Sequence, residues 1–429
     1  MGQNKKFLKE ALILIFLGLF FMFFYSGLQN DHINVLTPYL QGAYEWPDLK
    51  ITNPITIASY FAILLYLVVG AAMVRFGVRA ILIPSIFLLA LACVGISIAG
   101  ENYLIYALSA FSVRALVVPM QLGAFMLCAN WFIKYRGRVL GIITAGSPVF
   151  SMVGIAAMTA LTSTMGLGVY ALIAGVLLIL AIITAVGVKD TPEAMGLFPD
   201  GADHTPVSEA DDAGEPITVR QLFGEVRAWQ LIVSYGIMQF VIVAMMAYMA
   251  VRYISLSSPE NIPNLFVSDA LKYLALGAGG GIPMSFVLGW IDDKYGSITA
   301  SIVLNLLFFF AVIPLAIMPV GGDPLLMLVW AFGVACMVGG VPTMHPCITS
   351  YVYGRKHYME ANKWIMTVQA IPMAFALPFM GLFNQAGHLT QAYYVLAGLL
   401  VVSLITIITM RKIPDANIQD RAYGRRLET

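Results

Sequence analysis

Four neighbouring polar residues near the end of a long apolar run carry the most suggestive chemistry in this sequence. Residues 27–35 read GLQNDHINV and follow a run that holds no charge. Asn30 and Asn34 are four residues apart and Asp31 and Asn34 are three apart, so a helix through them would carry one polar face. Such a face can line a water-filled cavity, where Asp31 and His32 would ionise. The alternative is that the helix ends just before this cluster, which is then a solvated loop.

Other polar side chains stand inside apolar segments. Arg114 and His345 are the ionisable ones. An ionisable group costs roughly a few kcal/mol or more in hydrocarbon, so each is a candidate for function. His345 is either a core histidine bonded to a carbonyl oxygen or a ligand of substrate or protons. Gln121 and Gln369 are polar side chains that we expect to point inward.

Membrane-spanning helices must position these residues. Of the 429 residues, 60% are hydrophobic and 11% are charged, and the mean hydropathy is +0.84. That composition is typical of an integral membrane protein. Apolar stretches of about 20 residues predict helices, because a backbone in lipid must bond within its own segment. Twelve stretches qualify, near residues 11–36, 54–74, 80–99, 103–127, 138–162, 168–187, 229–254, 268–290, 299–319, 324–349, 364–384 and 390–410. The expected fold class is an all-α membrane protein with twelve transmembrane helices.

Charge and cysteine patterns exclude several classes of protein. The net charge of +1 offers no concentrated basic surface for a nucleic acid. The four cysteines have no metal-ligand spacing, and we expect them to pack in the core. A phosphate-binding Walker loop and a Ser/His/Asp arrangement are absent as motifs, so we expect neither an enzyme nor a cofactor. The glycines of GAGGGIP, residues 277–283, are expected to permit close helix contact or bending.

The distribution of Lys and Arg predicts orientation. With both termini in the cytoplasm, about 20 of the 24 basic residues fall on the cytoplasmic side. The first apolar run is too long for a signal-peptide core, so we expect it to remain in the mature protein. The expected location is the cell inner membrane, crossed many times.

The chain is expected to consist of two duplicated halves. Residues 189–228 are polar and poor in large apolar side chains, which predicts a cytoplasmic linker between bundles at 1–188 and 229–429. A shift of 219 residues supports the duplication, because it superposes Gly70 on Gly289, Arg75 on Lys294, Gly77 on Gly296, Cys128 on Cys347 and Arg136 on Arg355. Duplicated bundles are typical of secondary transporters.

Several motifs resemble one family. GAAMVRFGVRA at 70–80 and GWIDDKYGSI at 289–298 resemble the GxxxD(R/K)xGR(R/K) loop signature of the major facilitator superfamily. NWFIKYRGRVLGIITAG at 130–146, DTPEAMGLFPDG at 190–201 and YGRKHY at 353–358 are similar to segments of its oxalate/formate antiporter and monocarboxylate transporter branch. Four motifs in the expected order, one of them present twice, indicate the superfamily and favour this branch.

The resemblance implies that the two loops form a gate. In the family, an acidic residue of the loop faces the end of a helix and basic residues bridge to helix ends, in one conformation only. The second copy keeps Asp293 and Lys294, whereas the first has Val74 in place of the acid, so we expect an asymmetric gate. The alternative is that Arg75 and Arg79 only satisfy the orientation bias. The expected gating residues are Gly70, Arg75, Gly77, Arg79, Arg136, Gly289, Asp293, Lys294, Gly296 and Arg355.

The resemblance also implies a cavity site. Arg114 occupies a place where many proton-coupled members carry an arginine, and there it could pair with Asp31. Carboxylate-transporting relatives carry a basic residue at the position of Ser285 and sometimes another at or beside that of Gln369, and neither position is charged here. A monoanion, a zwitterion or a neutral polar metabolite therefore fits better than a dianion. The expected substrate-binding or proton-coupling residues are Asn30, Asp31, His32, Asn34, Arg114, Gln121, Ser285, His345 and Gln369.

We therefore expect a secondary active transporter that moves a small organic anion by alternating access, driven by protons or by exchange. The alternative is an exporter of drugs or amphiphiles with the same fold, in which Asp31 would attract a cationic substrate. Each chain holds a complete pathway, so we expect it to function as a monomer. Its expected partners are the small-molecule substrate, protons and the lipid bilayer.

Overall fold

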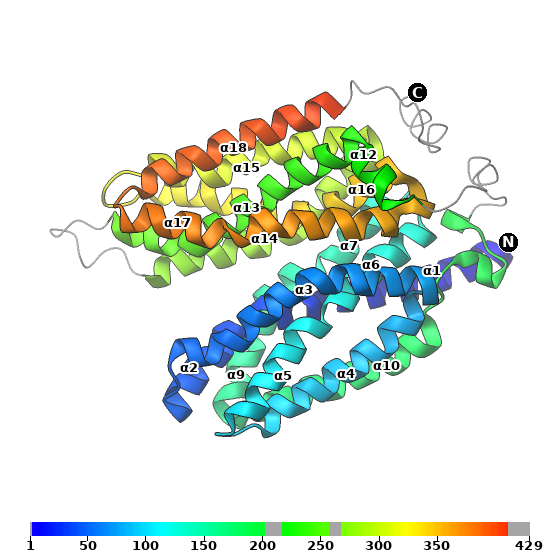
Figure 1. Cartoon of the computed structure of the whole chain (residues 1–429), viewed down its shortest axis with the longest axis horizontal. Coiled ribbons are helices and arrows are strands. Elements are labelled where there is room, and N and C mark those ends of the chain that lie inside the picture. The colour runs from blue at the N-terminus through cyan, green and yellow to red at the C-terminus, as the bar shows by residue number, and fades with distance from the viewer. Residues whose placement is uncertain (1, 202–216, 257–266, 411–429) are drawn as a thin grey trace. The chain divides into compact units, whose positions relative to one another are not determined.

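The computed structural model describes residues 2–201, 217–256 and 267–410, and every regular element in them is helical (Figure 1). The chain divides into two compact units. The first comprises Met1–Val207 with Tyr358–Trp364, and the second comprises Ser208–His357 with Ile365–Thr429. Residues 202–216, the acidic part of the predicted linker, lie outside the described residues.

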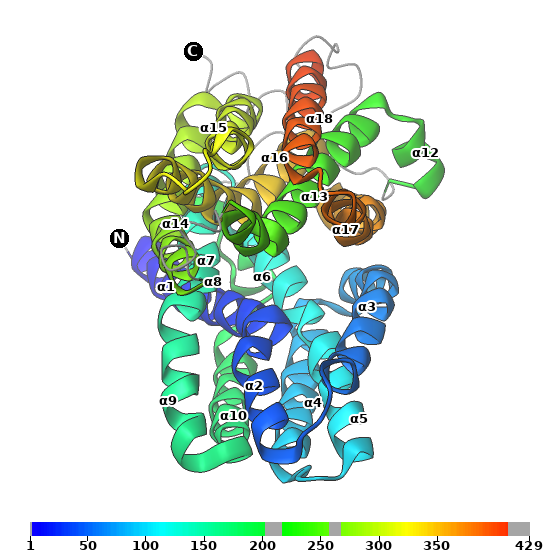
Figure 2. The ribbon, with the colours of Figure 1, turned by 90° about the vertical axis from the view of Figure 1, so that its left-hand side faces the viewer.

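The first unit is a bundle whose long helices are interrupted by short turns. Figure 2 shows α2, α4, α5, α9 and α10 of this unit, in which α4 packs against α5 and α10, and α9 contacts α2 and α10. The elements are α1 (Gly2–Ser26), π-helical η1 (Gly27–Asp31), α2 (Ile33–Tyr44), α3 (Asp48–Phe76), α4 (Val78–Ile98), α5 (Tyr103–Leu116), α6 (Val118–Trp131), α7 (Arg136–Thr144), α8 (Gly146–Val149), π-helical η2 (Phe150–Gly154), α9 (Ile155–Met165), η3 (Gly166–Gly168), α10 (Val169–Gly187), η4 (Pro192–Met195) and η5 (Pro199–Gly201).

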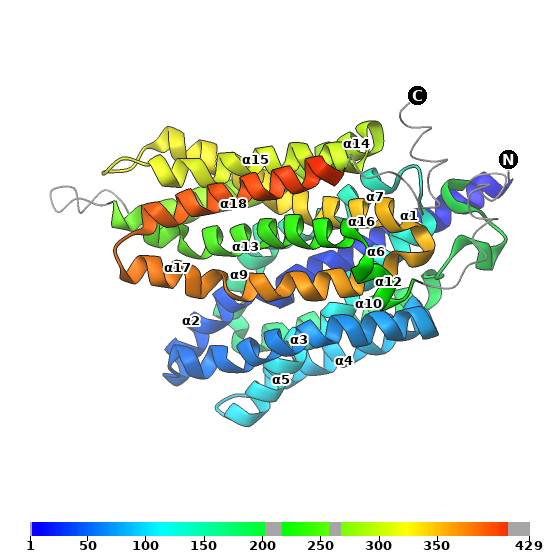
Figure 3. The same ribbon diagram turned by 45° about the horizontal axis from the view of Figure 1, so that its top comes forward.

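The second unit is a bundle of longer helices. Figure 3 shows α18 beside α13 and α15, and all three helices are in contact. The elements are α12 (Val219–Gly224), α13 (Val226–Ser255), α14 (Val267–Tyr295), α15 (Ser297–Ile317), α16 (Pro324–Ala374), α17 (Ala376–Gln385) and α18 (Leu389–Met410). The 51-residue α16 contains Gly354 with φ 66°, so it is two helices joined at a kink.

The expected membrane-spanning helices are present. Among the described residues, 11 helical stretches are long and apolar enough to cross a membrane. One of them, Arg136–Gly187, has 52 residues and turns at Gly166, whose φ is 58°. That stretch supplies two passes and the others one each, which confirms the predicted all-α membrane fold.

The duplication extends to the backbone. Helices α3 and α14 each have 29 residues, and α4 and α15 each have 21, at the same 219-residue shift. Gly77 and Gly296 occupy the corners between them with nearly equal dihedral angles, φ 90° and ψ 156° against φ 84° and ψ 156°. Only glycine adopts this region freely, so the glycine of each loop motif is required by the turn.

The glycines of α14 serve close packing, as predicted. A Cβ at Gly277 would come within 2.8 Å of the Ala331 carbonyl oxygen, and one at Gly281 within 3.3 Å of the Gly339 nitrogen. Helices α14 and α16 therefore approach backbone to backbone along this stripe.

Candidate functional site

The polar turn after α1 is helical, and its histidine is buried. Its backbone is a π-helix, in which the His32 N–H donates to the Gly27 carbonyl oxygen at 2.9 Å, and α2 follows at once. His32 is only 1% exposed. The helical backbone therefore continues past Gln29, and His32 does not lie in a solvated loop. The π-helical backbone at Asn30 differs from the α-helix that the sequence predicted. The side chains of both asparagines lie outside the described part of the structure.

Asp31 faces a second π-helical segment. The Ser151 hydroxyl of η2 donates to Asp31 Oδ2 at 2.6 Å. The two segments fit closely, because a Cβ at Gly27 would collide with the Phe150 ring. Paired π turns at a carboxylate are notable, since such turns concentrate at functional sites.

His32 is held by α10. Its Nδ1 lies 2.8 Å from the hydroxyl of Tyr170, and the two rings meet edge to face. Tyr170 is itself buried. This bond fixes the orientation of the imidazole ring at the junction of η1 and α2.

Arg114 is placed by a break in the fourth pass. Helix α5 ends at Leu116 and α6 begins at Val118, with Pro119 in its first turn. Arg114 therefore stands in the last turn of α5, where free carbonyl groups favour a cation. Its Nε donates to the Ser59 hydroxyl at 2.9 Å.

The Arg114 guanidinium is incompletely satisfied. The residue is 9% exposed, and its Nη1 is buried without a hydrogen-bond partner among the described residues. The predicted pair with Asp31 is not formed in this structure, because each group bonds a serine hydroxyl instead. A buried donor without an acceptor indicates a position that a ligand oxygen can fill.

A neutral hydrogen-bond network lies beside Arg114. The Tyr66 hydroxyl donates to Gln121 Oε1 at 2.7 Å and lies 3.2 Å from the Tyr25 hydroxyl. Both phenols interact electrostatically with the guanidinium. Gln121 therefore points inward, as expected, and Tyr66 lies between it and Tyr25.

In the second unit, His345 belongs to a separate polar cluster. It is 3% exposed, its ring meets the Tyr235 ring at 5.3 Å, and its Nε2 has no hydrogen-bond partner among the described residues. Gln369 donates to the Leu231 carbonyl oxygen at 2.9 Å and accepts from Gln239 at 3.4 Å. This cluster is a second place where a ligand could bond.

Ser285 has a local role. Its hydroxyl donates to the Ile282 carbonyl oxygen of its own helix at 2.7 Å. A Cβ at Gly339 would meet the Ser285 nitrogen at 2.8 Å, so the residue lies at the α14–α16 crossing. Its assignment to the substrate site remains a prediction.

The expected gating residues lie at helix ends. Arg79 donates from Nη2 to the Ala185 carbonyl oxygen at 2.5 Å. Arg75 stacks on Phe76, and Lys294 lies 4.8 Å from the centre of the Trp290 ring. The remaining gating residues lie as follows: Gly70 near the end of α3, Arg136 at the start of α7, and Gly289 and Asp293 near the end of α14. The side chain of Arg355 is outside the described residues.

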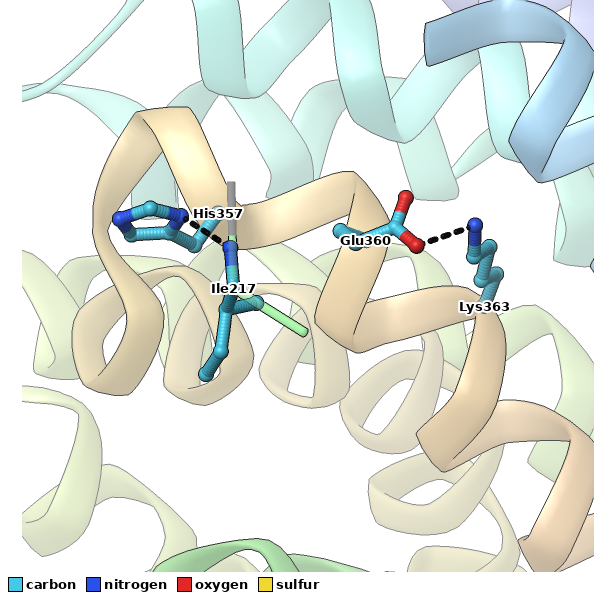
Figure 4. A network of polar contacts seen from close by, with 4 residues as sticks. All are labelled: Ile217, His357, Glu360 and Lys363. Atoms are coloured by element: carbon cyan, nitrogen blue, oxygen red, sulfur yellow. Dashed lines mark hydrogen bonds and ion pairs between the residues drawn. The ribbon is translucent and has the colours of Figure 1, made fainter. Parts of the chain in front are cut away.

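Polar contacts hold YGRKHY and the helical turn that follows it (Figure 4). His357 Nδ1 accepts from the Ile217 N–H at 3.1 Å, which ties the chain before α12 to α16. Lys363 and Glu360 form an ion pair at 2.5 Å, one helical turn further on. Among the described residues, no cluster of His, Cys, Asp or Glu is suited to a metal ion.

Sequence reasoning missed five partners of the site: Tyr25, Ser59, Tyr66, Ser151 and Tyr170. Hydroxyl groups in apolar helices usually bond their own helix, so no local pattern marked these residues. Only the fold, which brings residues of different helices together, reveals them.

Comparisons with known proteins agree with this architecture. A family model described as the Major Facilitator Superfamily matches residues 16–376. A search among curated protein sequences finds no match.

Solved structures match over nearly the whole chain. The E. coli fucose:proton symporter FucP has a TM-score of 0.68 at 14% identity, covering 94% of this chain and 98% of its own. The proton:xylose symporter XylE, bound to 6-bromo-6-deoxy-D-glucose, has a TM-score of 0.74 at 13% identity, covering 96% and 97%. At such identities the likeness concerns the fold.

Proposed function

Because the chain belongs to the Major Facilitator Superfamily, whose members are secondary transporters, we propose that it moves a small organic monoanion across the membrane by alternating access. The observation that supports an anion is the buried Nη1 of Arg114, which lacks an acceptor among the described residues. A carboxylate oxygen is the acceptor that suits a guanidinium best.

The charge of the substrate follows from what surrounds Arg114. Its neighbours Ser59, Tyr66 and Gln121 are neutral, and so are Ser285 and Gln369, where the family resemblance would place basic residues. One guanidinium offsets the desolvation of one carboxylate but not of two. A monocarboxylate therefore fits better than a dicarboxylate.

Asp31 is the residue that we assign to proton coupling. It is a carboxylate of the η1 turn, and its partner Ser151 is a neutral donor rather than a fixed cation. A carboxylate held only by a hydroxyl can gain and lose a proton without breaking an ion pair. The solved neighbours FucP and XylE are described as proton symporters, which supports this assignment.

We further propose the cell inner membrane, two bundles at 1–188 and 229–429 joined by a cytoplasmic linker, and a monomeric transporter. Both termini would face the cytoplasm, since that orientation places most Lys and Arg inside. Reporter fusions at either terminus test the orientation. Activity of a fused reporter that functions only outside the cytoplasm would contradict it.

Uptake by proteoliposomes tests the function. The panel contains labelled monocarboxylates, dicarboxylates, L-fucose and D-xylose, each with and without an imposed proton gradient. We expect gradient-driven uptake of a monocarboxylate by the parent and not by Arg114→Gln. Preferred uptake of a sugar or a dicarboxylate would contradict the monoanion proposal, and extrusion of amphiphilic cations alone would favour the exporter alternative.

A further inference from the structure

Residues 189–201 fold back over the end of the first unit where α1 begins. We call this segment the strap. It contains the short helices η4 and η5, and Lys6 donates to the Met195 carbonyl oxygen at 3.3 Å. Leu197 is 4% exposed, so the strap is packed against the bundle.

Asp190, near the start of the strap, binds the beginning of α4. Its Oδ1 accepts the Arg79 N–H at 2.8 Å, and its Oδ2 lies so close to Gly77 that a Cβ there would collide. Its carbonyl oxygen accepts from the Asn130 side chain at 3.0 Å. A carboxylate at this place bonds a free N–H of the first turn and opposes the positive end of the helix dipole.

Asp200, near the end of the strap, binds the loop between α6 and α7. Its carboxylate accepts three successive N–H groups, from Ile133 at 3.0 Å, Lys134 at 2.7 Å and Tyr135 at 3.4 Å. Burial raises the pKa of the Asp200 carboxyl, and the three donors oppose that effect. The residue has φ 57°, a left-handed conformation that the surrounding contacts must maintain.

These contacts bring a carboxylate to a loop that has none in its own sequence. The loop at 70–80 has Val74 where the second copy has Asp293, so it lacks its own acid. Asp190 places a carboxylate at the same loop from the far end of α10. The two loops held by the strap also carry the expected gating residues Arg79 and Arg136.

We propose that the strap is a positioning element of the transport cycle, in which Asp190 holds the first loop, which has no acid of its own, and Asp200 holds the second loop. The two loops then keep one geometry while the transporter changes conformation. The effect on turnover rests on the proposed function, whereas the attachment of the strap does not.

Thiol labelling tests the attachment. The four native cysteines are all buried, so a water-soluble maleimide should report on a new thiol introduced by Leu197→Cys. We expect Asp200→Ala to accelerate labelling about tenfold, because local opening rises when its charged hydrogen bonds are lost. Glu101→Gln, at an exposed carboxylate elsewhere in the unit, should leave the rate unchanged. An unchanged rate in Asp200→Ala overturns the proposal.

Transport kinetics test the role in the cycle. At equal amounts of folded protein in proteoliposomes, Asp190→Ala and Asp200→Ala should lower turnover about fivefold or more and leave KM within about twofold. If Asp200→Ala does not fold, Asp200→Asn is used in its place, because the amide side chain keeps one oxygen acceptor. Faster labelling with unchanged turnover would show that the strap only packs against the bundle, and it would overturn the proposal. If the parent transports nothing on the panel, the proposed function fails, while labelling still tests the strap.

Discussion

Arg114→Met removes a buried guanidinium while keeping much of the side-chain volume. Among the described residues, the only acceptor for Arg114 is Ser59, which bonds Nε at 2.9 Å, and Nη1 has none. Ser59 stays satisfied after the change, because its hydroxyl donates to the Ile55 carbonyl oxygen. Replacing buried ion pairs by hydrophobic side chains of similar volume is often neutral or stabilises a protein by about 1–4 kcal/mol, and the hydroxyl of Ser59 compensates Arg114 less than an ionised partner would. We therefore expect Arg114→Met to unfold at a higher temperature than the parent.

Transport should change in the opposite direction. Truncating one partner of a buried, hydrogen-bonded charge pair, such as Arg114 with a substrate carboxylate, costs about 2–5 kcal/mol. At about 1.4 kcal/mol for each factor of ten, kcat/KM for uptake should fall by at least about 30-fold. A variant that is more stable and less active would show that the protein keeps this arginine for its substrate.

The assay combines thermal unfolding in detergent with uptake by proteoliposomes at matched protein amounts. Arg252→Met is the matched control, because Arg252 is also buried, at 7% exposure, and its Nε donates to the Leu315 carbonyl oxygen at 3.0 Å. We expect this control to destabilise the protein and to leave uptake per folded molecule near that of the parent. The reasoning is refuted if Arg114→Met unfolds earlier than the parent and still transports normally.

Three further changes test the first unit. Asp31→Asn and Arg114→Gln should change the free energy of unfolding almost additively, within about 0.5 kcal/mol, because the two groups do not contact each other. A double variant much more stable than the sum of the two single effects would contradict this expectation. Ser151→Ala should lower proton-gradient-driven uptake about tenfold and lower substrate exchange less. Ser151→Thr, which keeps the hydroxyl, should restore most of the gradient-driven uptake. An equal loss of uptake and of exchange would argue against proton coupling. Gly27→Ala should destabilise by about 1–3 kcal/mol through a clash with Phe150, relieved by Phe150→Leu, and thermal unfolding checks both.

The helices and the duplication could be predicted because their signals extend over many residues. Runs of apolar residues define each pass, and the paired glycines at 77 and 296 mark the same corner twice. A register that repeats over a whole half is robust to errors at single positions.

The partners within the site could not be predicted, because they depend on local departures from regular geometry. The π turn at Gly27–Asp31 changes which side chains share a face, and no composition marks such a turn. Ser59 and Ser151 resemble many other hydroxyl residues in apolar helices, and only the fold brings them to Arg114 and Asp31.

The region 189–228 shows a different limit of sequence reasoning. Its low content of large apolar residues predicted a linker, yet its first part is held by polar contacts to backbone groups. The three N–H groups that bind Asp200 belong to the backbone of Ile133, Lys134 and Tyr135, so their side-chain identities carry no signal.

The repeated pairs of helices also constrain the lipid that surrounds the protein. Helices α4 and α15 have 21 residues each, about 32 Å at 1.5 Å per residue, which matches a hydrocarbon layer of about 30 Å. Their partners α3 and α14 have 29 residues each, about 44 Å, and must tilt or extend beyond that layer. The glycine corners at Gly77 and Gly296 fix the first residue of each shorter helix. Both halves therefore match the same bilayer thickness, and thicker membranes would have to thin locally around α4 and α15.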